Sequence, residues 1–213
     1  MPVTIVNNII RNKVFFDVGA NNGFTSVPVA MNNKEFSVYA FEPTPEMIEQ
    51  IESKIIGLDN YFLTTKAVSN YEGKATFRVA GHADWGCSSL LEFSEKSKTE
   101  WPGRTDFDVT NEIEVDVIRL DKFIEENKIT KIDYLHIDTQ GSDLKVLEGL
   151  GKYISIVEEG GMEAAAKEDI LYKGQNTQQQ SIEFLQKNGF DITGIQINDE
   201  YQNEVNIYFK KRK

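Results

Sequence analysis

The sequence predicts an α/β fold in which helices flank both faces of a mainly parallel sheet, with an antiparallel edge at its C-terminal end. Short β-type runs alternate with helix-like segments along most of the 213 residues, and such units form right-handed crossovers between parallel strands. The chain then closes with two strand patterns, at residues 192–197 and 205–209, that no helix separates. This late pair predicts the antiparallel edge.

The first strand leads into a turn that has the form of a nucleotide cradle. Residues 14–18 are a short β-type run, followed by a turn with Gly19 and Gly23 and then by a helix-like segment. Glycines let the backbone approach a ligand, and the N-terminus of the following helix faces it. The dinucleotide fingerprint with three spaced glycines is absent. A purely structural turn therefore stays open as the alternative.

Six further runs of β-type residues predict strands, several of them with the alternating polarity of a half-buried strand. They lie at residues 36–41, 61–68, 74–79, 113–118, 132–138 and 153–157. We expect the last of them to end at two glutamates and a glycine pair.

Capping residues predict where the helices begin. Thr44 is expected to cap a helix that has a proline at its first position, and Ser142 to cap a second helix. Thr177 and Gln180 have the spacing of a capping box. A short acidic helix is predicted at residues 121–127.

The composition is that of one globular domain, which we expect to span residues 1–213. The formal net charge is −11, and this argues against partners that present phosphate, namely nucleic acid and anionic membranes. No run approaches the roughly 20 apolar residues needed to cross a bilayer. Cys87 is the single cysteine, so neither an intrachain disulfide nor a cysteine-based metal site is expected. Together with an N-terminus unlike a secretory signal, this predicts a cytoplasmic location.

Several strand tips carry side chains suited to a ligand site. In open α/β sheets ligands bind beyond the carboxyl ends of the strands, where these residues would meet. One acid at a strand end is uninformative, because acids often cap the following helix. Acids or amides at several tips of one sheet instead predict a composite pocket. The residues are Asp17, Glu42, the small apolar pair Ala67 and Val68, and the group His136, Asp138 and Gln140.

These motifs, in their order, give the chain a specific resemblance. It resembles the FkbM-type methyltransferases, a branch of the S-adenosylmethionine-dependent class I (Rossmann-like) methyltransferases. The motifs are FFDVGANNG, FEP, AVSN followed by EGKATF, VDVIRLDKFI, HIDTQGSDLKVLEG, LYKGQ, a late GF and the closing VNIYFKK. They span nearly the whole chain. The resemblance implies a three-layer Rossmann-like sandwich and S-adenosylmethionine as cofactor.

The resemblance also assigns cofactor contacts. It places the loop after the first strand at the methionine and ribose part, Glu42 at the ribose hydroxyls, and the pair Ala67 and Val68 beside the adenine. Asp138 would lie near the transferring methyl group. The loop residues concerned are Asp17, Gly19, Ala20, Asn21 and Gly23. Thr25 and Pro43 are further candidate contacts to the cofactor. The chain departs from the family at His136, where a lysine is frequent, at Gln140, where an acid is common, and at Asp143, where glutamate is frequent.

The implied reaction is in-line methyl transfer to a hydroxyl group of a sugar or secondary metabolite. The enzyme must align the reacting atoms, and a base must take the hydroxyl proton. Strand alternation puts Tyr134, His136 and Asp138 on one face. His136 is the candidate base, or it orients Asp138 in that role; the alternative is a hydrogen-bonded core histidine. His82 is the second candidate.

The segment 81–110 is predicted to be a long loop or lid that meets the acceptor. It is rich in polar residues and contains Trp85, Trp101 and Ser88, and aromatic faces stack on sugar rings. Gln140 is a further candidate contact to the acceptor. An ordinary surface excursion, with the tryptophans anchoring it to the core, is the alternative.

A divalent ion such as Mg²⁺ is compatible with the sequence but not required by it. Its oxygen ligands would come from Asp138, Asp143, Glu158 and Glu159. Two other classes stay open, a nicotinamide-dependent oxidoreductase and a non-catalytic protein that binds S-adenosyl compounds. The sequence makes no prediction of the oligomeric state.

Overall fold

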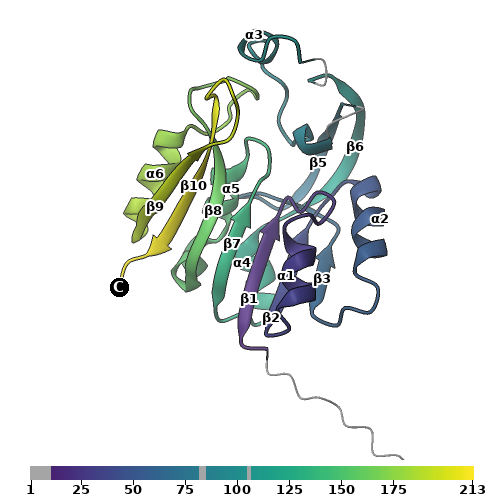
Figure 1. The fold of residues 1–213 in the computed structure, drawn as a ribbon, viewed down its shortest axis with the longest axis vertical. Helices are drawn as coiled ribbons and strands as arrows, with labels where there is room; N and C mark the ends of the chain where they lie inside the picture. Colours follow the sequence, from purple (N-terminus) through teal and green to yellow (C-terminus); the bar gives the residue numbers. More distant parts are fainter. Residues whose placement is uncertain (1–10, 82–84, 105–106) are drawn as a thin grey trace, which may run out of the picture.

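The computed structural model describes residues 11–81, 85–104 and 107–213, and it confirms the predicted α/β class (Figure 1). Its main sheet has seven strands in the order β3-β2-β1-β7-β8-β10-β9. The first five of these run parallel to one another, and β10 is antiparallel to both of its neighbours. The strands are β1 (Lys13–Val18), β2 (Phe36–Phe41), β3 (Tyr61–Thr64), β7 (Ile132–Ile137), β8 (Val157–Ala165), β9 (Phe190–Ile197) and β10 (Glu204–Lys211).

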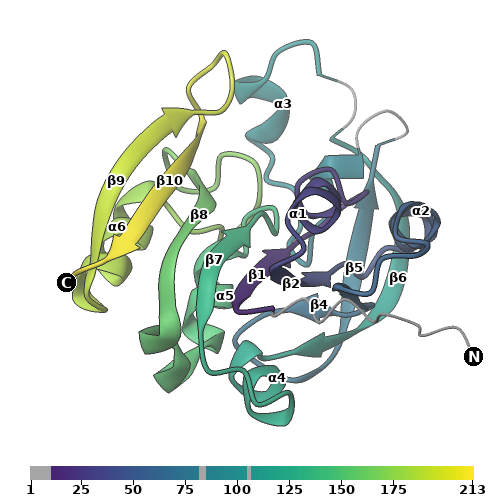
Figure 2. The same cartoon turned by 60° about the horizontal axis from the view of Figure 1, so that its bottom comes forward.

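Helices cover the sheet on both faces and make the fold three layers deep (Figure 2). Helices α1 (Ser26–Asn32) and α2 (Pro45–Lys54) pack on one face, where Phe15 of β1 contributes to the core. Helices α4 (Leu120–Glu126), α5 (Asp143–Gly149) and α6 (Gln178–Lys187) pack on the other, where Phe16 lies. Successive residues of a strand point to opposite faces, so β1 is apolar on both sides.

A second, three-stranded sheet corrects one predicted strand. It contains β4 (Ala67–Val68), β6 (Val109–Ile118) and β5 (Gly73–Ala80), in the order β4-β6-β5. The predicted strand at 61–68 is therefore wrong as a single element, because its two halves pair in different sheets. The break carries Ala67 and Val68 away from the main sheet and over its carboxyl edge.

The predicted strand at 153–157 is also wrong. Residues Gly151–Ile156 form the 3₁₀ helix η2, and the strand begins at Val157 and continues through the glycine pair. These glycines allow close packing and do not mark a turn. A Cβ on Gly160 would lie 2.3 Å from the carbonyl oxygen of Leu135 and 2.6 Å from the ring of Phe209. The longer strand brings Glu163 beside the end of β7.

The predicted caps have mixed outcomes. Thr177 and Gln180 form the expected capping box at the start of α6. Ser142 and Thr44 occupy the N-cap positions of α5 and α2, but neither side chain makes the capping hydrogen bond. At α5 the carboxylate of Asp143 instead accepts from the backbone N–H groups of Thr139 and Gly141, at 2.9 and 3.1 Å.

The described parts of segment 81–110 pack against the later chain. They include the 3₁₀ helix η1 (Trp85–Cys87) and helix α3 (Ser97–Glu100), which lies beyond the carboxyl edge of the sheet (Figure 1). Trp101 is only 2% exposed and clusters with Phe107 and Tyr172. The ring of Trp101 therefore anchors this segment, which is the alternative that the sequence left open. His82 lies outside the described residues.

Within the parts of the chain that the structure describes, no helix is long and apolar enough to cross a membrane.

Candidate functional site

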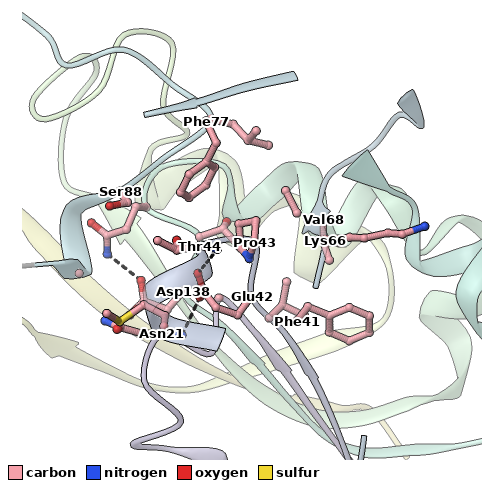
Figure 3. Close-up of a pocket in the computed structure, with 18 residues that line it drawn as sticks. Asn21, Phe41, Glu42, Pro43, Thr44, Lys66, Val68, Phe77, Ser88 and Asp138 are labelled. Carbon is pink, nitrogen blue, oxygen red and sulfur yellow. Dashed lines mark hydrogen bonds between the residues drawn. The ribbon is translucent and has the colours of Figure 1, made fainter. Parts of the chain in front are cut away.

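The carboxyl ends of β1, β2 and β7 meet in register at one edge of the main sheet. Asp17 on β1 lies opposite Ala40 on β2 and His136 on β7, so the loops after these three strands converge. They border a narrow cleft with an empty volume of about 580 Å³ (Figure 3). Seven of the predicted cofactor residues line it, which are Gly19, Asn21, Glu42, Pro43, Ala67, Val68 and Asp138.

Glu42 connects the loops on two sides of the cleft. Its Oε2 accepts from the backbone N–H of Asn21 at 2.8 Å, and its Oε1 accepts from that of Thr44 at 2.9 Å. The side chain is 5% exposed, and burial raises the pKa of this carboxyl to about 7 although the two hydrogen bonds act in the opposite direction. Each carboxylate oxygen can accept a second hydrogen bond, so Glu42 can still hold ligand hydroxyls.

Gly19 brings the loop after β1 into contact with the loop after β7. Its φ is +84°, and a Cβ there would lie 1.8 Å from the carbonyl oxygen of Asp138. The approach is fixed by the backbone N–H of Asp138, which donates to the carbonyl of Val18 at 2.9 Å. Only glycine permits this geometry, because the Cβ of any other residue would overlap the carbonyl oxygen of Asp138.

The cleft is polar at one end and apolar at the other. Figure 3 shows Asn21, Glu42 and Asp138 gathered together, with Phe77 and Val68 lying further along. The two apolar side chains come from the smaller sheet, which forms this part of the wall. This distribution fits S-adenosylmethionine, which has a polar amino-acid and ribose part and a planar adenine.

Four residues predicted to bind the cofactor do not line the cleft. Asp17 is completely buried, and its Oδ1 lies 2.8 Å from Nδ1 of His136, while its Oδ2 has no hydrogen-bond partner among the residues that the structure describes. Ala20 is buried in the core beneath α1. Gly23 is needed for packing, since a Cβ there would lie 2.7 Å from the side chain of Val27. Thr25 is exposed at the start of α1.

His136 faces Asp17 and lines neither this cleft nor the second cavity described below. Burial disfavours its charged form, but the hydrogen bond and the charge of Asp17 outweigh this effect. The pKa of His136 is therefore raised above its ordinary value of 6.5. This arrangement suits a histidine that holds the buried carboxylate in place.

Gln140 links the groups around Asp138. Its Nε2 donates to Asp138 Oδ1 at 2.7 Å and to Glu163 Oε2 at 2.9 Å, and its Oε1 accepts from the hydroxyl of Tyr172 at 2.9 Å. Its φ is +55°, and its carbonyl accepts from Ser89 Oγ at 2.7 Å. The side chain borders the cleft with its hydrogen-bonding groups already engaged by protein partners.

Glu163 and Tyr172 were missed by the sequence analysis. Glu163 is 6% exposed and shares with Asp138 the face of the sheet on which α1 packs. The glycine pair hid it, because we read those glycines as the end of a strand. Had β8 been extended past them, strand alternation would have placed Glu163 beside Asp138.

The other predicted acceptor contacts are only partly placed. Ser88 lines the cleft, and its Oγ accepts from the backbone N–H of Ala80 at 3.0 Å. The backbone of Trp85 belongs to η1, but its side chain lies outside the described part of the structure.

The predicted metal ligands do not come together. Asp143 uses its carboxylate to accept backbone N–H groups. Glu158 and Glu159 lie at the amino end of β8, where Glu159 pairs with Lys210 at 2.8 Å, and Asp138 lies at the opposite edge of the sheet. Among the described residues, no group of three or more His, Cys, Asp or Glu side chains is arranged to hold a metal ion.

A second cavity adjoins the cleft and has an empty volume of about 650 Å³. Gly86, Asp138 and Gln140 line both, so the two spaces meet at Asp138. Burial raises the pKa of Glu204 to about 8, with the charge of Asp138 adding to the effect. Burial and the same neighbouring charge also raise the pKa of Glu163 well above its usual range.

Comparison with known proteins identifies the family. The family model of the methyltransferase FkbM domain matches residues 17–192 of the chain. The chain belongs to the FkbM methyltransferase domain family. The prediction made from the ordered motifs is thus confirmed.

One curated relative is similar over part of the chain. It is the 2-O-methyltransferase NoeI of Sinorhizobium fredii, which is 26% identical over 140 residues. The match covers 64% of this chain and 56% of that protein, so the chain spans little more than half the length of its relative.

Three solved structures share the fold of this chain. Fibrillarin from Methanococcus jannaschii gives a TM-score of 0.53 at 14% identity, over 95% of this chain and 68% of its own. Fibrillarin from Aeropyrum pernix, solved with natively bound S-adenosyl-L-methionine, gives 0.52 at 11% identity, over 93% and 66%. An rRNA methylase from Streptococcus thermophilus gives 0.50 at 10% identity, over 96% and 90%. This confirms the Rossmann-like class I architecture.

Proposed function

We propose that this chain uses S-adenosylmethionine to methylate a hydroxyl group of a small molecule, a sugar or a secondary metabolite. Membership of the FkbM family supports methyl transfer, and similarity to a 2-O-methyltransferase supports oxygen as the acceptor atom. The observation that carries the proposal is the cleft itself. It is polar at Glu42, apolar at Val68 and open to a second cavity at Asp138.

The residues of the cleft have separate tasks in this proposal. Glu42 accepts hydrogen bonds from the ribose hydroxyls, and the backbone of Gly19 and Asn21 faces the amino-acid part. Val68 and Phe77 cover the adenine. When bound, S-adenosylmethionine supplies an electrophilic methyl group on a sulfonium.

Asp138 is the proposed base, because it lies where the cleft and the second cavity meet. Its carboxylate takes the hydroxyl proton as the new carbon–oxygen bond forms and the carbon–sulfur bond breaks, which leaves S-adenosylhomocysteine and a methyl ether. Gln140 holds Asp138 in position through its 2.7 Å hydrogen bond. His136 has a supporting role and holds Asp17.

Two measurements test this function. Isothermal titration should show binding of S-adenosylhomocysteine but not of NAD, and a donor-turnover assay over a panel of hydroxyl compounds should show methyl transfer. Asp138→Asn should keep S-adenosylhomocysteine binding within about threefold and lower turnover by about 100-fold or more, since general bases contribute this much. Asp116→Asn is the control, because Asp116 is exposed on β6 and does not line the cleft. Preferential binding of NAD would refute the proposal.

The remaining expectations stay part of the proposal. They are a single methyltransferase domain, a cytoplasmic location, and an acceptor that is neither nucleic acid nor membrane. Divalent metal dependence is a separate question. Loss of turnover with a chelator, restored by Mg²⁺, would establish it.

A further inference from the structure

The second cavity lies beyond the last residues of β8 and the first residues of β10. It is on the side of Asp138 that faces away from the apolar end of the cleft. Strand β10 runs antiparallel to β8 (Figure 1). Its first residue, Glu204, pairs with Ala165 at the end of β8. This places Glu204 at the same edge of the sheet as Asp138. Trp101 and Leu171 from the two packed segments beyond the sheet contribute the apolar part of the lining.

The charged part of the lining is strongly unbalanced. Among the described residues that line this cavity, Arg104 alone carries a positive charge. Four carry carboxyl groups, namely Asp138, Glu163, Asp199 and Glu204. Burial raises the pKa values of Glu163 and Glu204, and the charge of Asp138 raises both further. The charge of Glu204 also contributes to the raised pKa of Glu163. Once these groups are ionised, which for Glu204 occurs above about pH 8, the cavity resists any further negative charge.

The carboxyl groups differ in how they are already used. Glu163 accepts from Gln140 and from Asn198 Nδ2, the latter at 2.5 Å. Asp199 accepts three backbone N–H groups in the β9–β10 turn, so its role there is structural. Glu163 and Glu204 therefore give the lining its acceptor capacity, since carboxyl oxygens have lone pairs beyond those already engaged.

We propose that the second cavity receives the methyl acceptor and selects one that offers several hydroxyl groups and carries no negative charge. Acceptor hydroxyl groups satisfy the carboxyl oxygens of Glu163 and Glu204, whereas a carboxylate or phosphate on the acceptor is repelled by the ionised forms of these groups. The selection favours neutral polyols and glycosides, and it works against an RNA acceptor, whose phosphates flank every ribose hydroxyl. This inference rests on the proposed function, because it takes Asp138 as the reacting end of the cavity.

A paired ligand series tests the inference without knowledge of the natural acceptor. Protein saturated with S-adenosylhomocysteine is titrated at pH 9, where Glu204 is ionised, with neutral methyl glycosides, with the matching uronates and sugar phosphates, and with a short RNA. Binding is followed by saturation-transfer NMR. We expect the neutral glycosides to bind at least about tenfold more tightly than their anionic counterparts, and RNA not to compete with them.

Glu204→Gln then assigns the discrimination to the cavity. This substitution removes one carboxylate and should reduce the preference for neutral over anionic ligands about tenfold at pH 9, where Glu204 of the unchanged protein is ionised. Glu163→Gln should act in the same direction. It is the second choice because Glu163 also accepts a hydrogen bond from the amide of Gln140, which the substitution can disturb. The matched control is Glu200→Gln, which changes the net charge equally from an exposed position in the same turn.

The possible outcomes are distinguishable. Equal binding of neutral and anionic ligands, preferred binding of RNA, or no binding of either sugar series to protein that binds S-adenosylhomocysteine would overturn this inference and leave the cofactor proposal standing. If S-adenosylhomocysteine itself did not bind, the proposed function would fail, and the inference with it.

Discussion

A substitution at Glu42 should change the stability of the fold and the binding of the cofactor in separately measurable ways. We consider Glu42→Gln, which removes the charge and nearly keeps the shape. In the folded chain burial raises the pKa of this carboxyl from 4.5 to about 7, so the folded state binds more protons than the unfolded state between these values. Stability must therefore fall as the pH rises through this range. The raised pKa of Glu42 corresponds to a loss of about 3 kcal/mol in the free energy of unfolding, since one pKa unit equals about 1.4 kcal/mol at 25 °C.

The effect on the free energy of unfolding is best measured as a difference between two pH values. Gln can replace only one of the two acceptors that serve Asn21 and Thr44, so the variant carries a cost of about 1 to 3 kcal/mol that does not depend on pH. Against this constant offset, the stability of Glu42→Gln relative to the unchanged protein should rise by about 3 kcal/mol between pH 4.5 and pH 8.

Urea unfolding followed by circular dichroism at a series of pH values measures this change. Glu49→Gln, at an exposed position of the following helix, is the control and should show little dependence on pH. The same Glu42 variant should bind S-adenosylhomocysteine about 10- to 100-fold more weakly, because charge-assisted hydrogen bonds to the ribose are lost. A stability difference that stays constant with pH would refute the reasoning that burial dominates at Glu42.

Three further changes test other parts of the argument. Gly19→Ala should lower the free energy of unfolding by about 3 kcal/mol more than Gly57→Ala does, as measured by urea unfolding. Both glycines have φ above +80°, but only at Gly19 would a Cβ lie 1.8 Å from a carbonyl oxygen. Equal losses of stability in the two variants would contradict this close approach. His136→Ala should destabilise the fold by about 3 kcal/mol below pH 6.5, and by less as the pH rises above it, because the raised pKa of His136 reflects its bond to Asp17. Turnover of this folded variant should stay within about fivefold, and a larger loss with an altered pH profile would restore the histidine as base. Thr177→Ala should cost about 1 kcal/mol by loss of the capping box, and no change would mean that the box does not stabilise α6.

Local sequence signals predicted those features whose causes are local. The capping box at Thr177 depends on residues three apart, and the turn at Gly19 depends on a strand running into glycines. The alternation of strands and helices predicted the parallel sheet and its antiparallel edge. Side-chain alternation also placed His136 and Asp138 on one face of β7. The errors arose where the meaning of a residue depends on a partner far along the chain.

Glycine shows this limit most clearly. Gly160 was predicted to mark the end of a strand, but it lies inside β8. A glycine is needed there because Leu135 and Phe209 leave no room for a side chain. That misreading hid Glu163 and with it the second cavity. In the same way, residues 61–68 divide between two sheets because Ala67 finds its hydrogen-bonding partner in β6, roughly fifty residues later.

The opening loop and the tip acids were thus predictable from the sequence itself, because Gly19, Glu42 and Asp138 each stand at the carboxyl end of a predicted strand. Only the tertiary structure decided which side chains border the cleft. It turned Asp17 inward to His136, and it brought Glu163 and Glu204 beside Asp138. The physical reason is that burial and charge arise from neighbours in space, and strand pairing between distant segments selects those neighbours.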